Sequence, residues 1–209
     1  MRTKIVEIGL GQTGTRSVAQ AVAWMGYKAR HGLKGVSLEM KQDYAQCLME
    51  GVPWGFGLYD EFDFVGNVSL LHWELLLEFE PEMKFILSLR GIDGWIAAAR
   101  AEFRTRRRRM QDWRRVGSIP FDQISTFGPL MLFGSYVFQE DIWRAGFERY
   151  YEQAREAIPA DRLFEVDVFR GDKMRDLADW LDSPNKPPQD LVYPKKKKSG
   201  VMNSKNYPW

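Results

Sequence analysis

The first stretch with chemical meaning is a glycine-rich segment near the N-terminus, residues 9–14, with the sequence GLGQTG. Thr15 and Ser17 follow it and add hydroxyl groups beside the glycines. Backbone N–H groups of such a turn can converge on one point, and a helix that starts there adds its positive dipole end. This arrangement predicts a site for a phosphate-like anion.

The flanking segments are suited to hold that turn in place. Residues 4–8 (KIVEI) are rich in β-branched side chains and predict a strand. From Thr15 onward apolar residues recur at intervals of three and four, which predicts a helix that ends near Met25. A strand, a glycine turn and a helix start in that order place the turn at the carboxyl end of the strand.

The rest of the chain alternates in the same way. Further strands are expected at 27–31, 84–89 and 163–166, and helices at 36–49, 70–79, from about 95, at 138–158 and at 174–181. The nearly continuous apolar run at 84–89 favours a central parallel strand covered on both faces. Residues 60–67 (DEFDFVGN) are acidic and aromatic and are expected to lead toward the cleft. The pattern predicts an α/β fold with three layers and a mainly parallel sheet, with a P-loop-like loop after the first strand.

Composition limits the classes of protein that fit. The 209 residues are 44% hydrophobic, which suits one domain over 1–209, with 183–209 as an extended basic tail packed on it. A net charge of +2 excludes a general polycation, so any preference for anions must be local. The single cysteine, Cys47, excludes an internal disulfide and a cysteine metal cluster. With no signal peptide and no long apolar run, we expect a soluble cytoplasmic protein without a membrane span or metal.

Two families of phosphate-binding loop fit poorly or in part. The nucleoside triphosphatase P-loop requires a lysine where this chain has Thr15, which argues against ATP hydrolysis. The Rossmann fingerprint is matched by Gly9, Gly11 and Gly14, but the next strand ends in Arg30 and His31 in place of an acidic residue. An arginine there favours NADP, so an NADP-binding oxidoreductase stays open as an alternative.

Most of the chain resembles a third family. GLGQTGTRS resembles the 5'-phosphosulfate loop of sulfotransferases that use 3'-phosphoadenosine 5'-phosphosulfate (PAPS), with Thr13-Gly14-Thr15 as the direct match. YKARHG at 27–32 resembles the strand ending in histidine that follows in that family. PEMKFILSLRGIDGWIAAA at 81–99 resembles its second signature, and 162–181 resembles its last strand and helix. The similarity is greatest to the short bacterial-type branch.

The resemblance implies a role for particular residues. PAPS carries two anionic groups and needs two anion sites at the carboxyl edge of the sheet. The residues implied for its binding are Gly11, Gln12, Thr13, Gly14, Thr15, Arg16, Ser17, Arg90, Lys196, Lys198, Ser199 and Gly200. Arg90 suits a phosphate because its guanidinium group can donate two parallel hydrogen bonds. The implied activity is transfer of a sulfuryl group from PAPS to a hydroxyl or amine of a small molecule or glycan.

A base is needed to take the acceptor proton, and histidine is the usual choice near neutral pH. His31 ends the second strand and is favoured, whereas His72 lies in an apolar segment and is expected in the core. Asp63 and Glu7 are alternatives. We expect Asp63, Asn67, Arg104 and Arg107 near the acceptor.

Two residues depart from the family pattern. Gln12 stands where the family usually has a cation, and loss of such a group elsewhere lowers rates by about 10²–10³. Ala98 stands where a serine usually contacts the 3'-phosphate. These departures leave open a slow enzyme or a protein that binds nucleotide without transfer.

The arginines at 104–109 form a separate basic cluster. They fit an exposed helix face, an anionic acceptor, or a non-catalytic protein that binds polyanions, although nucleic acid is not the expected partner. Both a monomer and a homodimer fit the sequence.

Overall fold

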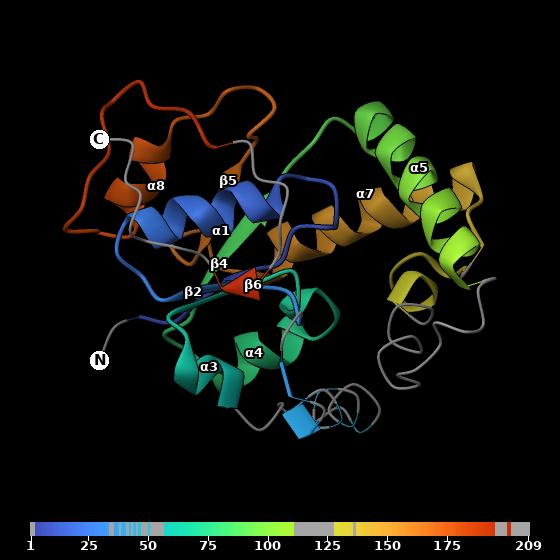
Figure 1. Cartoon of the computed structure of the whole chain (residues 1–209), viewed down its shortest axis with the longest axis horizontal. Coiled ribbons are helices and arrows are strands. Elements are labelled where there is room, and N and C mark those ends of the chain that lie inside the picture. The colour runs from blue at the N-terminus through green and yellow to red at the C-terminus, as the bar shows by residue number, and fades with distance from the viewer. Residues whose placement is uncertain are drawn as a thin grey trace.

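The structure is a computed structural model that describes residues 3–33, 36–37, 39–40, 42, 44, 46, 50, 57–110, 128–135, 137–194 and 200–201. A six-stranded sheet runs through the centre of this part of the chain, with helices on both of its faces (Figure 1). Its strands are β1 (Ile5–Glu7), β2 (Ala29–His31), β3 (Phe64–Gly66), β4 (Lys84–Ser88), β5 (Leu163–Val166) and β6 (Gly200–Val201).

The strand order is β5-β4-β1-β3-β2-β6. The first five strands pair in parallel, and β6 pairs antiparallel with β2. In the central register Glu7 lies opposite Gly66 of β3 and Ile86 of β4. The carboxyl ends of three parallel strands therefore meet at one edge, where the glycine loop follows β1.

Each face of the sheet has its own hydrophobic core, because successive side chains of a strand point to opposite faces. Ile5 packs with α1 (Thr15–Trp24) and α8 (Met174–Trp180) on one face. Val6 packs with the second set of helices on the other face. That set comprises α3 (Gly57–Glu61), α4 (Trp73–Phe79), α5 (Ile92–Met110) and α7 (Glu140–Ala157). The two cores confirm the predicted three-layer α/β fold with a mainly parallel sheet.

Most predicted elements lie within a few residues of their expected bounds, including β1, β4, β5, α7 and α8. The helix expected at 70–79 is divided into a 3₁₀ turn, η1 (Ser69–Leu71), and α4. Much of the helix expected at 36–49 lies outside the described residues.

Residues 60–67 contain a strand that was not predicted from the sequence. Phe64–Gly66 is strand β3, which is inserted between β1 and β2. Three residues between an acidic turn and Asn67 are too few for a periodic pattern to reveal. The insertion also contradicts the Rossmann alternative, because that fold places its second strand directly beside its first.

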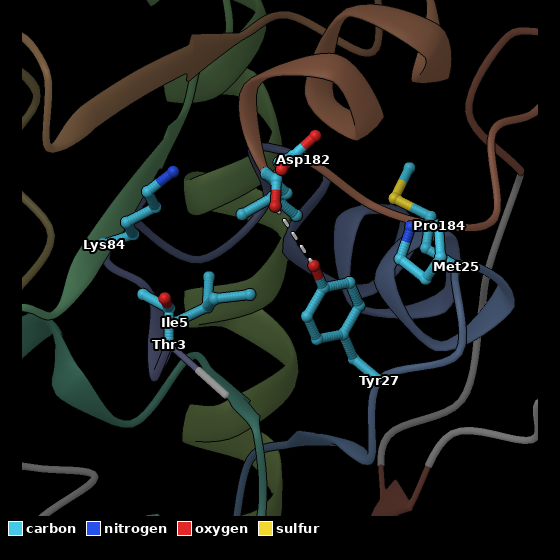
Figure 2. A pocket seen from close by; sticks show the side chains of 8 residues that line it. Thr3, Ile5, Met25, Tyr27, Lys84, Asp182 and Pro184 are labelled. Atoms are coloured by element: carbon cyan, nitrogen blue, oxygen red, sulfur yellow. Dashed lines mark hydrogen bonds between the residues drawn. The ribbon is translucent and has the colours of Figure 1, made fainter. Parts of the chain in front are cut away.

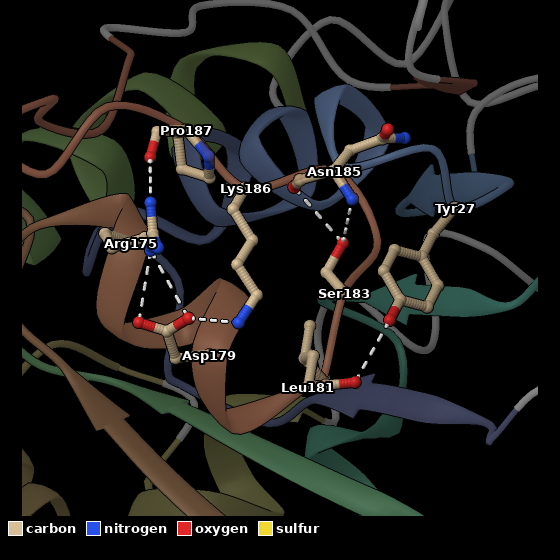
Figure 3. A network of polar contacts seen from close by, with 8 residues as sticks. All are labelled: Tyr27, Arg175, Asp179, Leu181, Ser183, Asn185, Lys186 and Pro187. Carbon is tan, nitrogen blue, oxygen red and sulfur yellow. Dashed lines mark hydrogen bonds and ion pairs between the residues drawn. The ribbon is translucent and has the colours of Figure 1, made fainter.

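The segment after α8 is fastened to the body of the protein, as Figure 3 shows. Asp179 accepts hydrogen bonds from Arg175 and Lys186, and Asn185 Nδ2 donates to Met25 O at 3.1 Å. The chain is described again at β6, where Gly200 lies opposite His31. Extended tail residues thus lie on α1 and on the sheet, while Lys196, Lys198 and Ser199 lie outside the described residues.

Candidate anion-binding site

The loop between β1 and α1 adopts a backbone shape that suits an anion. Gln12 and Gly14 have left-handed φ values of 76° and 99°. No described residue accepts a hydrogen bond from the amides of Gly11, Gln12, Gly14 or Thr15. Helix α1 starts without a side-chain cap and has no acidic residue in its first turn. Unpartnered N–H groups at the positive end of a helix dipole are the elements of a phosphate site.

The carbonyl oxygens of the same loop are already bonded to protein donors. Trp95 Nε1 donates to Gly11 O at 2.9 Å, and Arg90 Nη1 donates to Gln12 O at 3.0 Å. Donors from α5 and from the residue pair after β4 therefore bind the carbonyl oxygens of the loop. Its N–H groups remain available to a ligand.

Arg90 follows β4 and lies against the loop, as the sequence predicted for the carboxyl edge. Its guanidinium carbon lies 4.3 Å from the centroid of the Phe169 ring, in a cation–π contact. A Cβ atom on Gly94 would lie 3.2 Å from Arg90 Nε, so this glycine leaves room for the side chain. Phe169 is 56% exposed. An exposed aromatic ring and a guanidinium group therefore lie beside the unpartnered amides.

A buried polar cluster lies beneath the loop. Glu7 is fully buried, and its carboxyl oxygens accept from the amides of Gly9 at 2.8 Å and Asn67 at 3.2 Å. Ser88 Oγ is hydrogen-bonded both to Glu7 Oε1 at 2.7 Å and to Thr13 Oγ1 at 2.6 Å. Burial raises the pKa of Glu7 to about 8, against hydrogen bonds that lower it.

Thr13 lies in this cluster and not at the exposed side of the loop. Its side chain is fully buried, and Thr13 Oγ1 donates to Leu10 O at 2.6 Å. The expectation that this hydroxyl contacts the ligand does not fit its position. Thr13 instead closes the turn from below.

His31 and Thr15 are brought together by the fold. Thr15 Oγ1 lies 2.7 Å from His31 Nε2, and both side chains are buried. Burial and the nearby charge of Arg16 lower the pKa of His31 to about 4, so its imidazole is neutral at neutral pH. A neutral imidazole is the form that a base requires, and this one is in contact with the hydroxyl group of Thr15 at the end of the loop.

The predicted acceptor residues do not lie together. Asn67 borders the loop, because a Cβ atom on Gly11 would lie 3.9 Å from Asn67 Oδ1. Asp63 precedes β3 and accepts from Lys28 N, so it lies at the opposite edge of the sheet. Arg104 is exposed on α5, about 18 Å along the helix from its first residue at 1.5 Å per residue. Arg107 belongs to α5, but its side chain lies outside the described part.

The other histidine is part of the core, as expected. His72 is buried, and its Nε2 lies 2.9 Å from the hydroxyl of Tyr59. Burial lowers the pKa of His72 to about 4. It takes no part in the loop site.

A cavity of about 340 Å³ lies far from this loop, between the start of the sheet and the end of α1 (Figure 2). Ile5 and Lys84, at the amino ends of β1 and β4, line it together with Met25 and Tyr27. Since the loop follows the carboxyl end of β1, this cavity belongs to the opposite edge.

The sulfotransferase domain family matches residues 4–202. The chain belongs to this family. A search of curated proteins finds no match. The sulfotransferase domain thus spans the glycine loop, Arg90 and the final strand–helix pair.

Within the described ranges, none of the helices is both long and apolar enough to cross a membrane. The same ranges hold no group of three residues suited to bind a metal ion.

Several site residues were not predicted from the sequence. The ring of Phe169 contacts Arg90, Trp95 Nε1 donates to Gly11 O of the loop, and Ser88 joins the buried cluster. Trp95 had a signal, since it opens the helix that follows the Arg90 strand. Phe169 and Ser88 had none, because only the parallel pairing of β5, β4 and β1 brings them to the loop.

Proposed function

We propose that this sulfotransferase binds PAPS at the loop of residues 9–15 and transfers its sulfuryl group to a hydroxyl or amine acceptor. The observation that carries the proposal is the contact of Arg90 with Gln12 O, beside four loop amides that have no acceptor among the described residues. It combines a cluster of neutral donors with a permanent positive charge in one place.

The loop amides would hold the 5'-phosphosulfate group. In the transfer, the S–O bond to the phosphate breaks and a new bond forms from sulfur to the acceptor atom. The proton of the acceptor passes to water, and adenosine 3',5'-bisphosphate leaves with the negative charge. Fixed N–H donors and a helix dipole stabilise this developing charge without reorganising. Positioning and charge stabilisation are the main contributions in related phosphoryl transfers.

Arg90 and Phe169 would bind the nucleotide part. The guanidinium group suits the 3'-phosphate. Ala98 cannot donate the hydroxyl hydrogen bond that the family usually supplies to this phosphate. The exposed ring of Phe169 suits stacking of the adenine base. The close approach of Arg90 to Gln12 also brings a cation near the place where the loop lacks one.

The remaining predicted residues are proposed to have separate roles in binding and positioning. Gly11, Gln12, Gly14 and Thr15 are the proposed loop contacts, with Arg16 and Ser17 following in the first turn of α1. Gly200 would bring the basic tail to β2, next to His31. We assign His31 to the orientation of Thr15, and Glu7 and Asp63 are not proposed as bases, since one is buried and the other lies at the far edge.

The deciding experiment is equilibrium binding of adenosine 3',5'-bisphosphate, NADPH and ATP, followed by a transfer assay with sulfur-labelled PAPS. The assay would use phenol, alcohol, amine and sugar acceptors. Binding of the bisphosphate and label transfer to one acceptor class are expected. Binding of NADPH alone would reject the proposal. Salt-sensitive binding of RNA, without binding of any of the three ligands, would also reject it.

A further inference from the structure

The buried carboxyl group of Glu7 joins three chain segments at the edge of the sheet. It lies in β1, and it contacts the loop through Gly9 N, the end of β3 through Asn67 N, and β4 through Ser88 Oγ. Gly9 allows this approach, because a Cβ atom there would lie 2.6 Å from Glu7 Oε1 and 2.1 Å from Ser88 Oγ. The carboxyl group therefore determines how closely the loop packs against the ends of β3 and β4.

The number of hydrogen bonds beneath the loop can be compared with the number of hydrogens available to form them. Three contacts form a chain from Leu10 O to Thr13 Oγ1, from Thr13 Oγ1 to Ser88 Oγ, and from Ser88 Oγ to Glu7 Oε1, at 2.6, 2.6 and 2.7 Å. Each contact needs one hydrogen. A carbonyl oxygen supplies none, and each hydroxyl supplies one. If Thr13 donates to Leu10 O and Ser88 donates to Glu7 Oε1, no hydrogen is left for the contact between the two hydroxyl groups. A proton on Glu7 supplies the third hydrogen, because Ser88 can then accept from Glu7 and donate to Thr13.

No neighbour can supply that hydrogen instead. The hydroxyl group of Tyr151 also lies within hydrogen-bond reach of the Thr13 side chain, but its hydrogen is donated to Ser88 O at 2.8 Å. Tyr150 donates its hydroxyl hydrogen to Ile8 O at 2.5 Å. The structure therefore requires the acid form of Glu7 for all three contacts to be hydrogen bonds.

We propose that Glu7 is a positioning residue whose protonated carboxyl group holds the loop in its anion-binding shape, and that its ionisation weakens anion binding. The inference rests on the proposed function, because it concerns the same loop. Loss of the proton would leave two oxygen lone pairs facing each other at one of the three contacts. Ser88 is fixed in β4, so Thr13 and the loop would move. A buried negative charge below the amides would also repel the ligand.

The surroundings of Glu7 favour the acid form near neutral pH. Burial raises the pKa of Glu7 to about 8, from an ordinary value near 4.5. The titratable groups that face it are Tyr150 and Tyr151 of α7, whose pKa values are themselves raised by burial. Both stay neutral while Glu7 titrates. Arg90, the cation that follows β4, is held by Gln12 O and Phe169 instead.

The test is the affinity for adenosine 3',5'-bisphosphate between pH 6 and pH 10. Its phosphates are fully ionised above about pH 7, since their second pKa is near 6. The native protein should lose about tenfold in affinity between pH 7 and pH 9. Glu7→Gln should have a flat profile over this range. The exposed Glu152→Gln on α7 serves as the matched control and should titrate like the native protein.

Ser88→Ala separates a positioning role from simple packing. It removes a hydroxyl group whose hydrogen bond lowers the pKa of Glu7, so the midpoint of the affinity profile should move to higher pH. A midpoint that stays or falls in Ser88→Ala would overturn the proposal, as would a native profile that is flat or a Glu7→Gln profile that keeps the native midpoint.

Inorganic pyrophosphate distinguishes the failure of this inference from that of the proposed function, because it needs the loop but no nucleotide site. Pyrophosphate binding with a Glu7-dependent midpoint, without bisphosphate binding, would reject the PAPS proposal and support this one. A loop that binds neither ligand at any pH would overturn both.

Discussion

Arg90 Nη1 lies 3.0 Å from the carbonyl oxygen of Gln12, so a guanidinium group just after β4 is bonded to the turn that follows β1. The two residues are 78 positions apart in the chain. This contact places a permanent cation beside a loop that has a glutamine where related loops carry a positive charge. Most expectations for ligand binding follow from it.

Arg90→Ala should weaken binding of adenosine 3',5'-bisphosphate by at least about 1.5 kcal/mol, the scale of one charged hydrogen bond. Arg90→Lys should recover only part of this loss, because an ammonium group lacks the planar fork. Isothermal titration calorimetry measures both. Arg149→Ala, at an exposed arginine of α7, is the control and should bind normally. An unchanged affinity in Arg90→Ala would remove this residue from the site.

Gln12→Lys should raise the rate of sulfuryl transfer by about 10-fold or more, because a single charge-stabilising group is worth about 10²–10³ in rate. The backbone of residue 12 is already left-handed, with φ 76°, and a lysine is no more strained there than a glutamine. Turnover numbers at saturating PAPS provide the measurement. Gln12→Met, which is similar in length and uncharged, should show no gain; equal gains in both variants would contradict the role of charge.

Phe169→Ala should weaken bisphosphate binding by about 1–3 kcal/mol, the usual contribution of stacking on one base. Inorganic pyrophosphate, which has no base, should bind as before. Competition titrations with both ligands test this directly. If pyrophosphate binding falls equally, Phe169 acts by supporting Arg90, whose guanidinium carbon lies 4.3 Å from the ring centroid, and not by stacking.

The free energy of unfolding should be greatest near pH 6.5. Burial lowers the pKa of His31 and His72 from 6.5 to about 4. The two neutral imidazoles therefore contribute fully to the free energy of unfolding above pH 6.5, and this contribution is lost as the pH falls toward 4. Burial raises the pKa of Glu7 from 4.5 to about 8, so its contribution is lost as pH rises from 4.5 to 8. Each proton changes the free energy by about 1.4 kcal/mol per pH unit.

Between pH 4.5 and 6.5 the two histidines outweigh Glu7, so the free energy of unfolding rises with pH. Between pH 6.5 and 8 only Glu7 titrates among these groups, and the free energy falls. Urea unfolding at a series of pH values measures this curve. Glu7→Gln should remove the fall above pH 6.5, and a fall that persists in that variant would assign it to another group.

Gly9→Ala should destabilise the fold by about 2 kcal/mol or more, because the added Cβ would lie 2.7 Å from the backbone oxygen of Ser88. Loop shape and anion affinity should be lost with it. Gly91→Ala is the matched control, because no atom lies within 4 Å of its Cβ position. Thermal unfolding of the two variants compares them. Equal melting temperatures would show that the loop does not depend on this close approach.

Elements with local signals could be predicted from the amino-acid sequence alone. Residues 4–25 contain a β-branched run, a glycine turn and a 3.6-residue apolar period, and these predicted β1, the loop and α1. The apolar run that forms β4 predicted a buried parallel strand with Arg90 just beyond it. In each case a few neighbouring residues decide the backbone conformation, so the pattern can be read without knowing the partner segments.

The way in which these elements share one edge of the sheet could not be predicted in this manner. Strand β3 is three residues long, and its insertion between β1 and β2 is a matter of pairing between distant segments. The same pairing directs Thr13 downward to Ser88, moves Asp63 to the far edge, and brings Phe169 over Arg90. Hydrogen bonds and ring contacts between segments far apart in the chain leave no periodic signal, because they depend on strand register and not on spacing along the sequence.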